Sequence, residues 1–169
     1  RQGDFNYDNF IDITDLAEST GAIDEIVGRH GRLDCLVNNA AVRDRRPLDE
    51  ITADDFRRLI ETNLVAQYEL ARAAARHMAV RGHGRLVFIS SMVGPQSFQG
   101  DPAYVASKGG LEALMRALAV ELGGKGVAAN AIAPGFFLTE RNAPFFEHPR
   151  IVEMARRIPL GRFGRPDEI

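Results

Sequence analysis

Features that would narrow the function are scarce in this chain of 169 residues. A single cysteine, Cys35, excludes a disulfide within the chain, and we expect a cytoplasmic location. Because Cys35 lies in an apolar run, its thiol is predicted to be buried and unreactive. No apolar run is long enough to span a membrane and no signal-peptide pattern opens the chain, so a membrane partner is not expected.

Residue clusters that bind metals or polyanions are also lacking. No metal site is predicted, because no ligand spacing relates the histidines at positions 30, 77, 83 and 148. The net charge of −2 and the pI near 6.1 disfavour nucleic acid and membrane surfaces as partners. The one basic run, Arg43, Arg45 and Arg46, is either a solvated loop or a contact for an anionic substrate.

Strand-like and helix-like segments alternate along the chain, which is 45% apolar. Apolar runs predict strands at residues 10–13, 33–37, 86–89 and 127–132. Cap signals predict helices that begin at Thr14 or Asp15, at Thr52 and at Asp101, and a short helix spans 150–157. The unbroken apolar run at 86–89 is typical of a strand covered on both faces. This alternation predicts a single α/β domain over residues 1–169 with a parallel sheet.

Polar or turn-forming residues lie in or just after the last part of each predicted strand. They are Asp12, Asn38, Ser91 and the pair Pro134-Gly135. Because ligands bind beyond the carboxyl ends of parallel strands, these positions are candidates for one site.

Tyr104 and Lys108 are four residues apart, which places them on one face of a helix. A nearby ammonium favours the phenolate, so Lys108 is predicted to lower the pKa of Tyr104 from its ordinary value near ~10. Such a phenol is a candidate general acid/base. Since Leu111 and Met115 share this face, we expect the pair to lean inward. The alternative is an exposed tyrosine and lysine without a joint role.

Three further features call for a physical reason. Asn63 falls inside an apolar helical stripe, so it either bonds nearby backbone or serves the site. Gly109-Gly110 inside a helix costs about 1 kcal/mol per glycine, which suggests close approach of another backbone, a second subunit being one option. The irregular segment that follows Gly135 carries four phenylalanines, which are either core residues or a lid over an apolar ligand: Phe136, Phe137, Phe145 and Phe146.

Together these residues resemble the short-chain dehydrogenase/reductase family from about Phe10 to Ile169. The motifs that carry the resemblance are, in family order, Asp12, Asn38-Asn39-Ala40-Ala41, Asn63, Ser91, Tyr104 with Lys108, Pro134-Gly135 and Thr139. The resemblance implies a partial doubly wound, Rossmann-like parallel sheet with helices on both faces. It also implies an NAD(P)-dependent oxidoreductase that interconverts a secondary alcohol and a ketone, with a small-molecule hydroxyl or carbonyl substrate and a homo-oligomeric (dimeric or tetrameric) state.

The resemblance assigns catalysis to Asn63, Ser91, Tyr104 and Lys108. Tyr104 would exchange the proton, and Ser91 would donate a hydrogen bond to the oxygen on which charge develops. Lys108 would keep the phenolate accessible and bond the nicotinamide ribose. Asn63 would hold a water that links Lys108 to solvent.

Cofactor and substrate contacts are implied in the same way. For the cofactor they are Asp12 and Ile13 at the adenine end, Asn38 and Ala40 along the middle, Phe137 and Thr139 at the carboxamide and phosphate side, with Pro134, Gly135, Tyr104 and Lys108. Met92 and Phe136 would border the substrate beside Ser91 and Tyr104.

The chain departs from the family pattern in two respects. Ala41 stands where the family usually has glycine, and no glycine-rich phosphate loop precedes Asp12. The family's last helix and edge strand are also not found before Ile169. We therefore expect an incomplete dinucleotide-binding and catalytic domain, belonging to a longer enzyme, a partly determined chain or a naturally short relative, in which NAD and NADP cannot be distinguished.

Two other functions remain open from the sequence. The chain could be a non-catalytic remnant that acts only through assembly with partner chains. It could also use a retained cofactor for epimerase or dehydratase chemistry. The connector at 159–166 and the phenylalanine-rich segment resemble those of family members that reduce ketoacyl groups or oxidise sugar acids.

Overall fold

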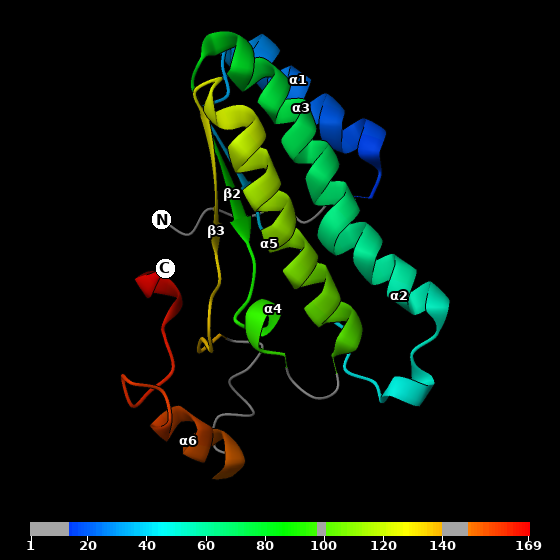
Figure 1. Cartoon of the computed structure of the whole chain (residues 1–169), viewed down its shortest axis with the longest axis vertical. Coiled ribbons are helices and arrows are strands. Elements are labelled where there is room, and N and C mark those ends of the chain that lie inside the picture. The colour runs from blue at the N-terminus through cyan, green and yellow to red at the C-terminus, as the bar shows by residue number, and fades with distance from the viewer. Residues whose placement is uncertain (1–13, 98–100, 140–148) are drawn as a thin grey trace. The chain divides into compact units, whose positions relative to one another are not determined.

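The computed structural model describes residues 14–97, 101–139 and 149–169. The chain divides into two compact units between Ala133 and Pro134, and each is described by itself. Figure 1 shows both, with helices and strands labelled. None of the helices within these ranges combines the length and the apolar composition needed to cross a bilayer.

Three parallel strands form the sheet of the first unit. They are β1 (Cys35–Asn38), β2 (Gly84–Ile89) and β3 (Val127–Ile132), in the spatial order β1-β2-β3. Cys35 pairs with Arg85, and Gly84 pairs with Val127. Parallel neighbours need long crossover connections, which the helices between the strands supply. The predicted parallel α/β architecture is confirmed.

The helices of the first unit begin and end where local chemistry permits. In α1 (Leu16–His30), the Asp15 carboxylate accepts a hydrogen bond from the Glu18 amide, and Gly31 ends the helix with φ 70°. A capping box of Thr52 and Asp55 starts α2 (Ala53–Ile60), preceded by the 3₁₀ turn η1 (Leu48–Glu50).

The helix that starts as α2 continues through a π-helical turn. This turn, η2 (Glu61–Val65), contains Asn63 and leads directly into α3 (Ala66–Arg81), which ends at Gly82. Single π-helical turns occur frequently at functional sites. The turn places Asn63 at a position that a regular helix would orient differently.

Helix α5 (Pro102–Gly123) crosses from β2 to β3 after the short helix α4 (Val93–Gln96). Its glycine pair faces neighbours in the same chain. A Cβ on Gly109 would lie 3.7 Å from the Gly94 carbonyl oxygen, and one on Gly110 would lie 3.0 Å from the side chain of Leu64. A side chain at Gly110 would therefore be tight against Leu64, whereas one at Gly109 would make an ordinary contact with the backbone of Gly94.

Helices α3 and α5 pack on one face of the sheet, and α1 packs against α3 on the same side (Figure 1). On that face Leu86 and Phe88 are fully buried in the core. The family resemblance implies helices on both faces of the sheet. Residues 14–133 supply the helices of this one face. Strand residues that point the other way are more exposed, and Val37 is 56% exposed.

Cys35 lies on the same open face, and the prediction that it is buried is wrong. Successive strand residues point to opposite faces of a sheet, so an apolar run is buried on both sides only where both faces are covered. The apolar sequence around Cys35 does not reveal which face is covered.

In the second unit, residues 134–169, a segment near the beginning contacts a segment near the end. The unit contains α6 (Pro149–Arg156) and the 3₁₀ turn η4 (Pro166–Glu168). Phe137 forms a β-bridge with Gly164, and the rings of Phe136 and Phe163 meet edge to face, 5.9 Å between centroids. Phe136 and Phe137 are thus half-buried and contact residues of their own unit, whereas Phe145 and Phe146 lie outside the described residues.

Gly126 marks a close approach of two loops at the amino end of the sheet. Its φ is 76°, and a Cβ there would lie 2.0 Å from the Gly82 carbonyl oxygen. We predict that Gly126→Ala lowers the free energy of unfolding of the full-length protein by about 2 kcal/mol or more, through backbone strain and this clash. Urea unfolding measures it.

Gly21→Ala is the matched control, because Gly21 lies inside α1 and a Cβ added there would meet open space. It should raise the free energy of unfolding by about 0.5–1 kcal/mol through helix propensity. Equal stability of Gly126→Ala and the wild type would contradict the loop geometry.

Candidate active site

The carboxyl end of β2 and the first turns of α5 bring three predicted residues together. Ser91 follows β2, while Tyr104 and Lys108 lie on α5. The Lys108 ammonium donates a hydrogen bond of 2.7 Å to the Ile89 carbonyl, and its Nζ lies 5.7 Å from the centre of the Tyr104 ring. Lys108 is only 1% exposed, so this helix face leans inward as predicted.

Burial sets the charge properties of Lys108. Desolvation lowers the pKa of Lys108 from 10.5 to about 8, because a charged ammonium is poorly solvated in the protein interior. Its hydrogen-bond partner is a neutral carbonyl, which offsets little of that loss. Lys108 can therefore change protonation state not far above neutral pH.

Tyr104 differs from the sequence prediction. Burial raises the pKa of Tyr104, whereas the charge of Arg43 and a hydrogen bond from Ser91 lower it, with a smaller influence from neighbouring charges. The net direction is upward, so the predicted lowering is wrong for this structure. The sequence spacing revealed the neighbouring cation but not the extent of burial.

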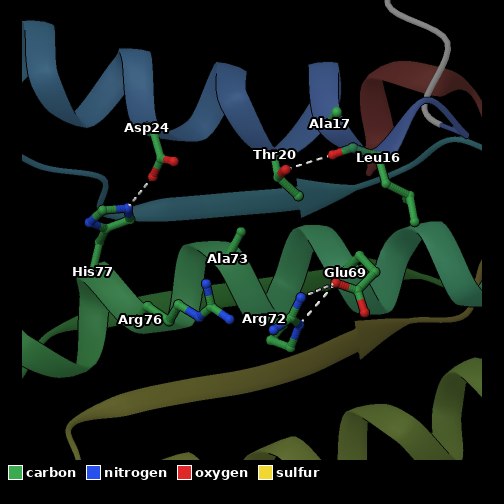
Figure 2. Close-up of a pocket in the computed structure, with 9 residues that line it drawn as sticks. All are labelled: Leu16, Ala17, Thr20, Asp24, Glu69, Arg72, Ala73, Arg76 and His77. Atoms are coloured by element: carbon green, nitrogen blue, oxygen red, sulfur yellow. Dashed lines mark hydrogen bonds and ion pairs between the residues drawn. The ribbon is translucent and has the colours of Figure 1, made fainter.

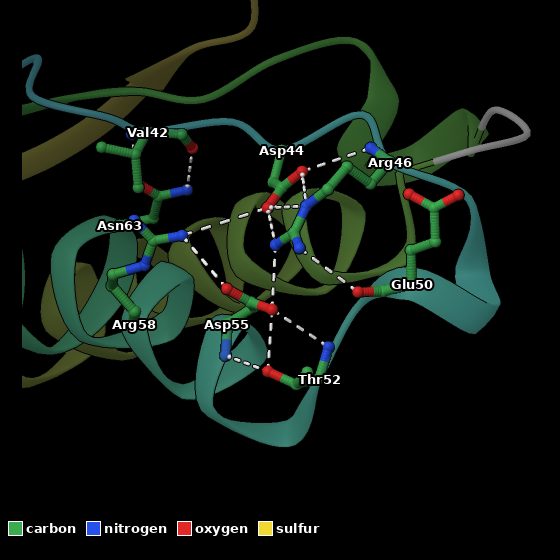
Figure 3. Close-up of polar contacts among 8 residues, drawn as sticks. All are labelled: Val42, Asp44, Arg46, Glu50, Thr52, Asp55, Arg58 and Asn63. Carbon is green, nitrogen blue, oxygen red and sulfur yellow. Dashed lines mark hydrogen bonds and ion pairs between the residues drawn. The ribbon is translucent and has the colours of Figure 1, made fainter.

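Asn63 contacts both the loop after β1, at Val42 (Figure 3), and helix α5, at Ser107. Its Oδ1 accepts from the Val42 amide at 2.8 Å, and its Nδ2 donates to the Val42 carbonyl at 2.9 Å and to Ser107 Oγ at 3.0 Å. The Ser107 hydroxyl in turn donates to the Tyr104 carbonyl at 2.8 Å. Both amide protons of Asn63 are thereby used on backbone and hydroxyl groups of the protein, as the backbone-bonding alternative expects. Its role in holding a water for Lys108 stays a prediction.

Sequence reasoning missed Gln67, one helical turn beyond Asn63. Gln67 is fully buried, and its Nε2 donates to the Ala40 carbonyl at 2.7 Å. Asn63 and Gln67 therefore hold the segment after β1 at two points. The signal in the sequence was a second amide four residues after the first on one apolar helix face.

Asn38 ends β1 with an unusual environment. It is 3% exposed, and within the described residues neither atom of its side-chain amide has a hydrogen-bond partner. A buried amide without partners costs about 1–3 kcal/mol. Ala40 lies two residues further on, so the carboxyl end of β1 carries two predicted cofactor residues. Strand β1 pairs with β2, which leads to Ser91.

Arg43 and Asp101 form an ion pair that the sequence prediction did not include. Arg43 Nε donates to Asp101 Oδ1 at 2.9 Å, and Arg43 Nη2 donates to Oδ2. The guanidinium carbon also lies 4.9 Å from the centre of the Tyr104 ring. Asp101 occupies the predicted N-cap position of α5, but its side chain makes no capping hydrogen bond.

Arg46 is also engaged by carboxylates (Figure 3). It forms ion pairs with Asp44 and Asp55, and Asp55 also closes the capping box of α2. Hydrogen bonds from Thr52, aided by Arg46, lower the pKa of Asp55 to about 2. Two of the three arginines in the basic run thus have carboxylate partners, which reduces their capacity to attract an anionic substrate.

The remaining predicted residues lie in other parts of the chain. Met92 immediately precedes α4 in the first unit. Pro134, Gly135, Phe136, Phe137 and Thr139 belong to the second unit, and Asp12 and Ile13 lie outside the described residues. The structure therefore brings together Asn63, Ser91, Tyr104 and Lys108, with Asn38 and Ala40 on the neighbouring strand end.

A separate groove of about 320 Å³ lies between α1 and α3 (Figure 2). Four of its polar side chains form two pairs: His77 with Asp24 at 2.7 Å, and Arg72 with Glu69. None of its lining residues belongs to the predicted site. In the part of the chain that the structure describes, no group of three or more acidic, histidine or cysteine side chains could hold a metal ion.

Comparison with known proteins places this geometry in context. The sequence profile of the short chain dehydrogenases matches residues 9–150. A 3-oxoacyl-[acyl-carrier-protein] reductase of Thermotoga maritima is 33% identical over 159 residues, which cover 94% of this chain and 64% of the relative. L-fucose dehydrogenase of Oryctolagus cuniculus is 40% identical over 165 residues, which cover 94% of this chain and 57% of the relative.

Among solved structures, a gluconate 5-dehydrogenase from Burkholderia cenocepacia in complex with NADP and tartrate is similar to this chain. The TM-score is 0.86 at 36% identity, over 94% of this chain and 62% of that one. The chain spans less than two thirds of the length of each of these three proteins.

The buried ammonium predicts a pH-dependent stability. Because the folded-state pKa of Lys108 is about 8 and the ordinary value is 10.5, the unfolded chain binds more protons between these values, and stability rises with pH. Replacing Lys108 by Met in the full-length protein removes this dependence. Lys108→Met should therefore raise the free energy of unfolding more at about pH 7 than at about pH 10.5. The difference between the two increases should be about 3 kcal/mol.

Lys125→Met is the control, because Lys125 is exposed. Urea unfolding at the two pH values measures both variants against the wild type. A gain from Lys108→Met that is the same at both pH values would contradict the burial of the charged form.

Proposed function

The chain belongs to the short-chain dehydrogenase family, and we propose that its function is NAD(P)-dependent interconversion of a secondary alcohol and a ketone, with Tyr104 as acid/base. The observation that carries this proposal is the convergence of Ser91, Tyr104 and Lys108 where β2 ends. A phenol, a hydroxyl and a buried ammonium in contact suit proton transfer to an oxygen atom. Asn63, in the π-helical turn η2, donates a hydrogen bond to Ser107, which lies on α5 between Tyr104 and Lys108.

The residues present fit a dinucleotide at this edge of the sheet. Asn38 is buried with an amide that has no partner in the described residues, and a polar ligand atom would satisfy it. Nucleotides bind beyond the carboxyl ends of parallel strands. The residues that would hold the cofactor are Asn38, Ala40, Tyr104 and Lys108, together with Asp12, Ile13, Pro134, Gly135, Phe137 and Thr139.

The chemistry divides between cofactor and protein. When bound, the nicotinamide supplies or accepts the hydride. In reduction, Tyr104 gives its hydroxyl proton to the carbonyl oxygen of the substrate, and Ser91 donates a hydrogen bond to the same oxygen. In oxidation, the phenolate of Tyr104 removes the proton of the alcohol. Ser91, Met92, Tyr104 and Phe136 border the substrate.

Lys108 maintains the proton supply of Tyr104. Its ammonium is held at the Ile89 carbonyl, so its distance from the phenol ring is fixed. Because burial lowers its pKa to about 8, Lys108 can release and regain a proton under mild conditions. Asn63 acts as a positioning residue, since its amide fixes Ser107 and through it the Tyr104 carbonyl.

The substrate class and assembly form part of the same proposal. The similar proteins are named for 3-oxoacyl-[acyl-carrier-protein], L-fucose and gluconate, each of which carries a hydroxyl or keto group. We therefore infer a small-molecule substrate of this kind, NAD or NADP as cofactor, and a cytoplasmic homo-oligomer, either a dimer or a tetramer.

The test is a turnover assay of the full-length protein with NADH or NADPH and a panel of ketones, ketoacyl thioesters and sugar acids. Tyr104→Phe should lower kcat/KM by about 10³-fold or more, because it removes the transferable proton. Ser91→Ala should lower it by about 10²-fold, because one donor to the reacting oxygen is lost.

Tyr68→Phe is the matched control, because Tyr68 is an exposed tyrosine on α3. This substitution should leave turnover unchanged. Normal turnover by Tyr104→Phe would refute the assignment of the acid/base. Substrate conversion without net consumption of NAD(P)H would point instead to epimerase or dehydratase chemistry.

A further inference from the structure

We propose that Arg43 is a positioning residue for Tyr104: its guanidinium, clamped by Asp101, lies over the phenol ring and stabilises the charge left there when the proton departs. The inference rests on the proposed function, because it concerns the same acid/base. It adds a second cation, from the loop after β1, to the lysine that the helix supplies.

The position of Arg43 is fixed from two directions. Asp101 receives two hydrogen bonds from the guanidinium and is only 4% exposed, so the pair is partly shielded from water. Bidentate arginine–carboxylate pairs are geometrically specific. Asp101 precedes Tyr104 by three residues at the start of α5, so the clamp and the phenol share one helical turn.

The loop that carries Arg43 is itself anchored on both sides. Before it, Val42 is held through both its amide and its carbonyl by Asn63. After it, Arg46 binds Asp44 and Asp55 (Figure 3). The guanidinium is thus presented to the ring by a segment with little freedom to move away.

Arg43 lies nearer the ring than Lys108 does. The guanidinium carbon is 4.9 Å from the ring centre, whereas Lys108 Nζ is 5.7 Å away. Burial lowers the pKa of Lys108 to about 8, so its charge is lost above that pH. Asp101 instead raises the pKa of Arg43, which therefore keeps its charge throughout the working range.

Five groups face the phenol from the elements around it. They are Arg43 and Arg45 on the loop, Asp101 and Lys108 on α5, and Ser91 after β2. Arg43, Ser91 and Arg45 favour the phenolate, whereas Asp101 opposes it, and the charge of Arg43 outweighs that of Asp101. Removal of Arg43 and removal of Asp101 should therefore act on Tyr104 in opposite directions, which mere loss of packing would not do.

The experiment follows the ionisation of Tyr104 directly, without cofactor or substrate. The full-length protein is labelled with tyrosine carrying ¹³C at Cζ, and the signal of Tyr104 is identified by its loss in Tyr104→Phe. In Arg43→Met the midpoint of this signal should rise by about one pH unit, since a cation at this distance is lost. In Arg43→Lys it should rise by less, because a charge is retained.

Asp101→Asn provides the opposite arm. It removes the opposing negative charge, while the amide oxygen of the asparagine can still accept a hydrogen bond from Arg43 and keep the guanidinium over the ring. The midpoint should therefore fall. Arg57→Met is the control of equal charge change, because Arg57 is exposed on α2 and pairs with Asp54. It should leave the midpoint unchanged.

The pH dependence of kcat/KM for alcohol oxidation should shift in the same directions as the NMR midpoints. An unchanged midpoint in Arg43→Met overturns the proposal. If Arg43→Met does not fold, Arg43→Gln takes its place, and an unchanged midpoint in that variant overturns the proposal. Because the NMR titration needs no turnover, failure of Arg43 to act on Tyr104 is distinguishable from failure of the proposed reaction, which Tyr104→Phe tests.

Discussion

The amide of Asn63 is the interaction on which the arrangement of the site depends. It satisfies both backbone groups of Val42 and the hydroxyl of Ser107, and so links the loop after β1, the π-helical turn and α5. Three separate segments of the chain are held in register by one buried side chain. A fully satisfied polar group of this kind specifies a unique geometry. An apolar residue of similar size would leave both backbone groups of Val42 without this partner, and Ser107 would keep only its hydrogen bond to the Tyr104 carbonyl.

Burial, rather than the distance between Tyr104 and Lys108, dominates the electrostatics of this pair. Desolvation raises the pKa of Tyr104 and lowers that of Lys108, so each group is held more firmly in its neutral form than it would be in water. The proton that Tyr104 gives up in reduction leaves a phenolate that burial disfavours. Cations beside the ring offset part of that cost, which gives the charges around Tyr104 their importance for its role as acid/base.

The fold and the central site residues were predictable from the sequence because they depend on local patterns. The apolar runs of the three described strands, the capping box at Thr52 and the spacing of Tyr104 and Lys108 each carry their own signal. What could not be predicted depends on which long-range partner a side chain meets. Asp101 illustrates this limit, since its position before a proline indicates an N-cap, yet an arginine 58 positions earlier takes its carboxylate. The burial of Tyr104 is likewise a property of the packed structure, and no spacing rule contains it.

The π-helical turn at Glu61–Val65 has a consequence for how this segment can vary in length. Such a turn accommodates one more residue than an α-helical turn, so the helical segments on either side keep their relative orientation. Deleting one residue here would restore a regular helix and leave buried Leu59 and Gln67 on their present faces. It would, however, move Asn63 away from its partners Val42 and Ser107. The extra residue of this turn therefore serves the orientation of one amide, and a shorter helix would keep its apolar stripe but lose that link.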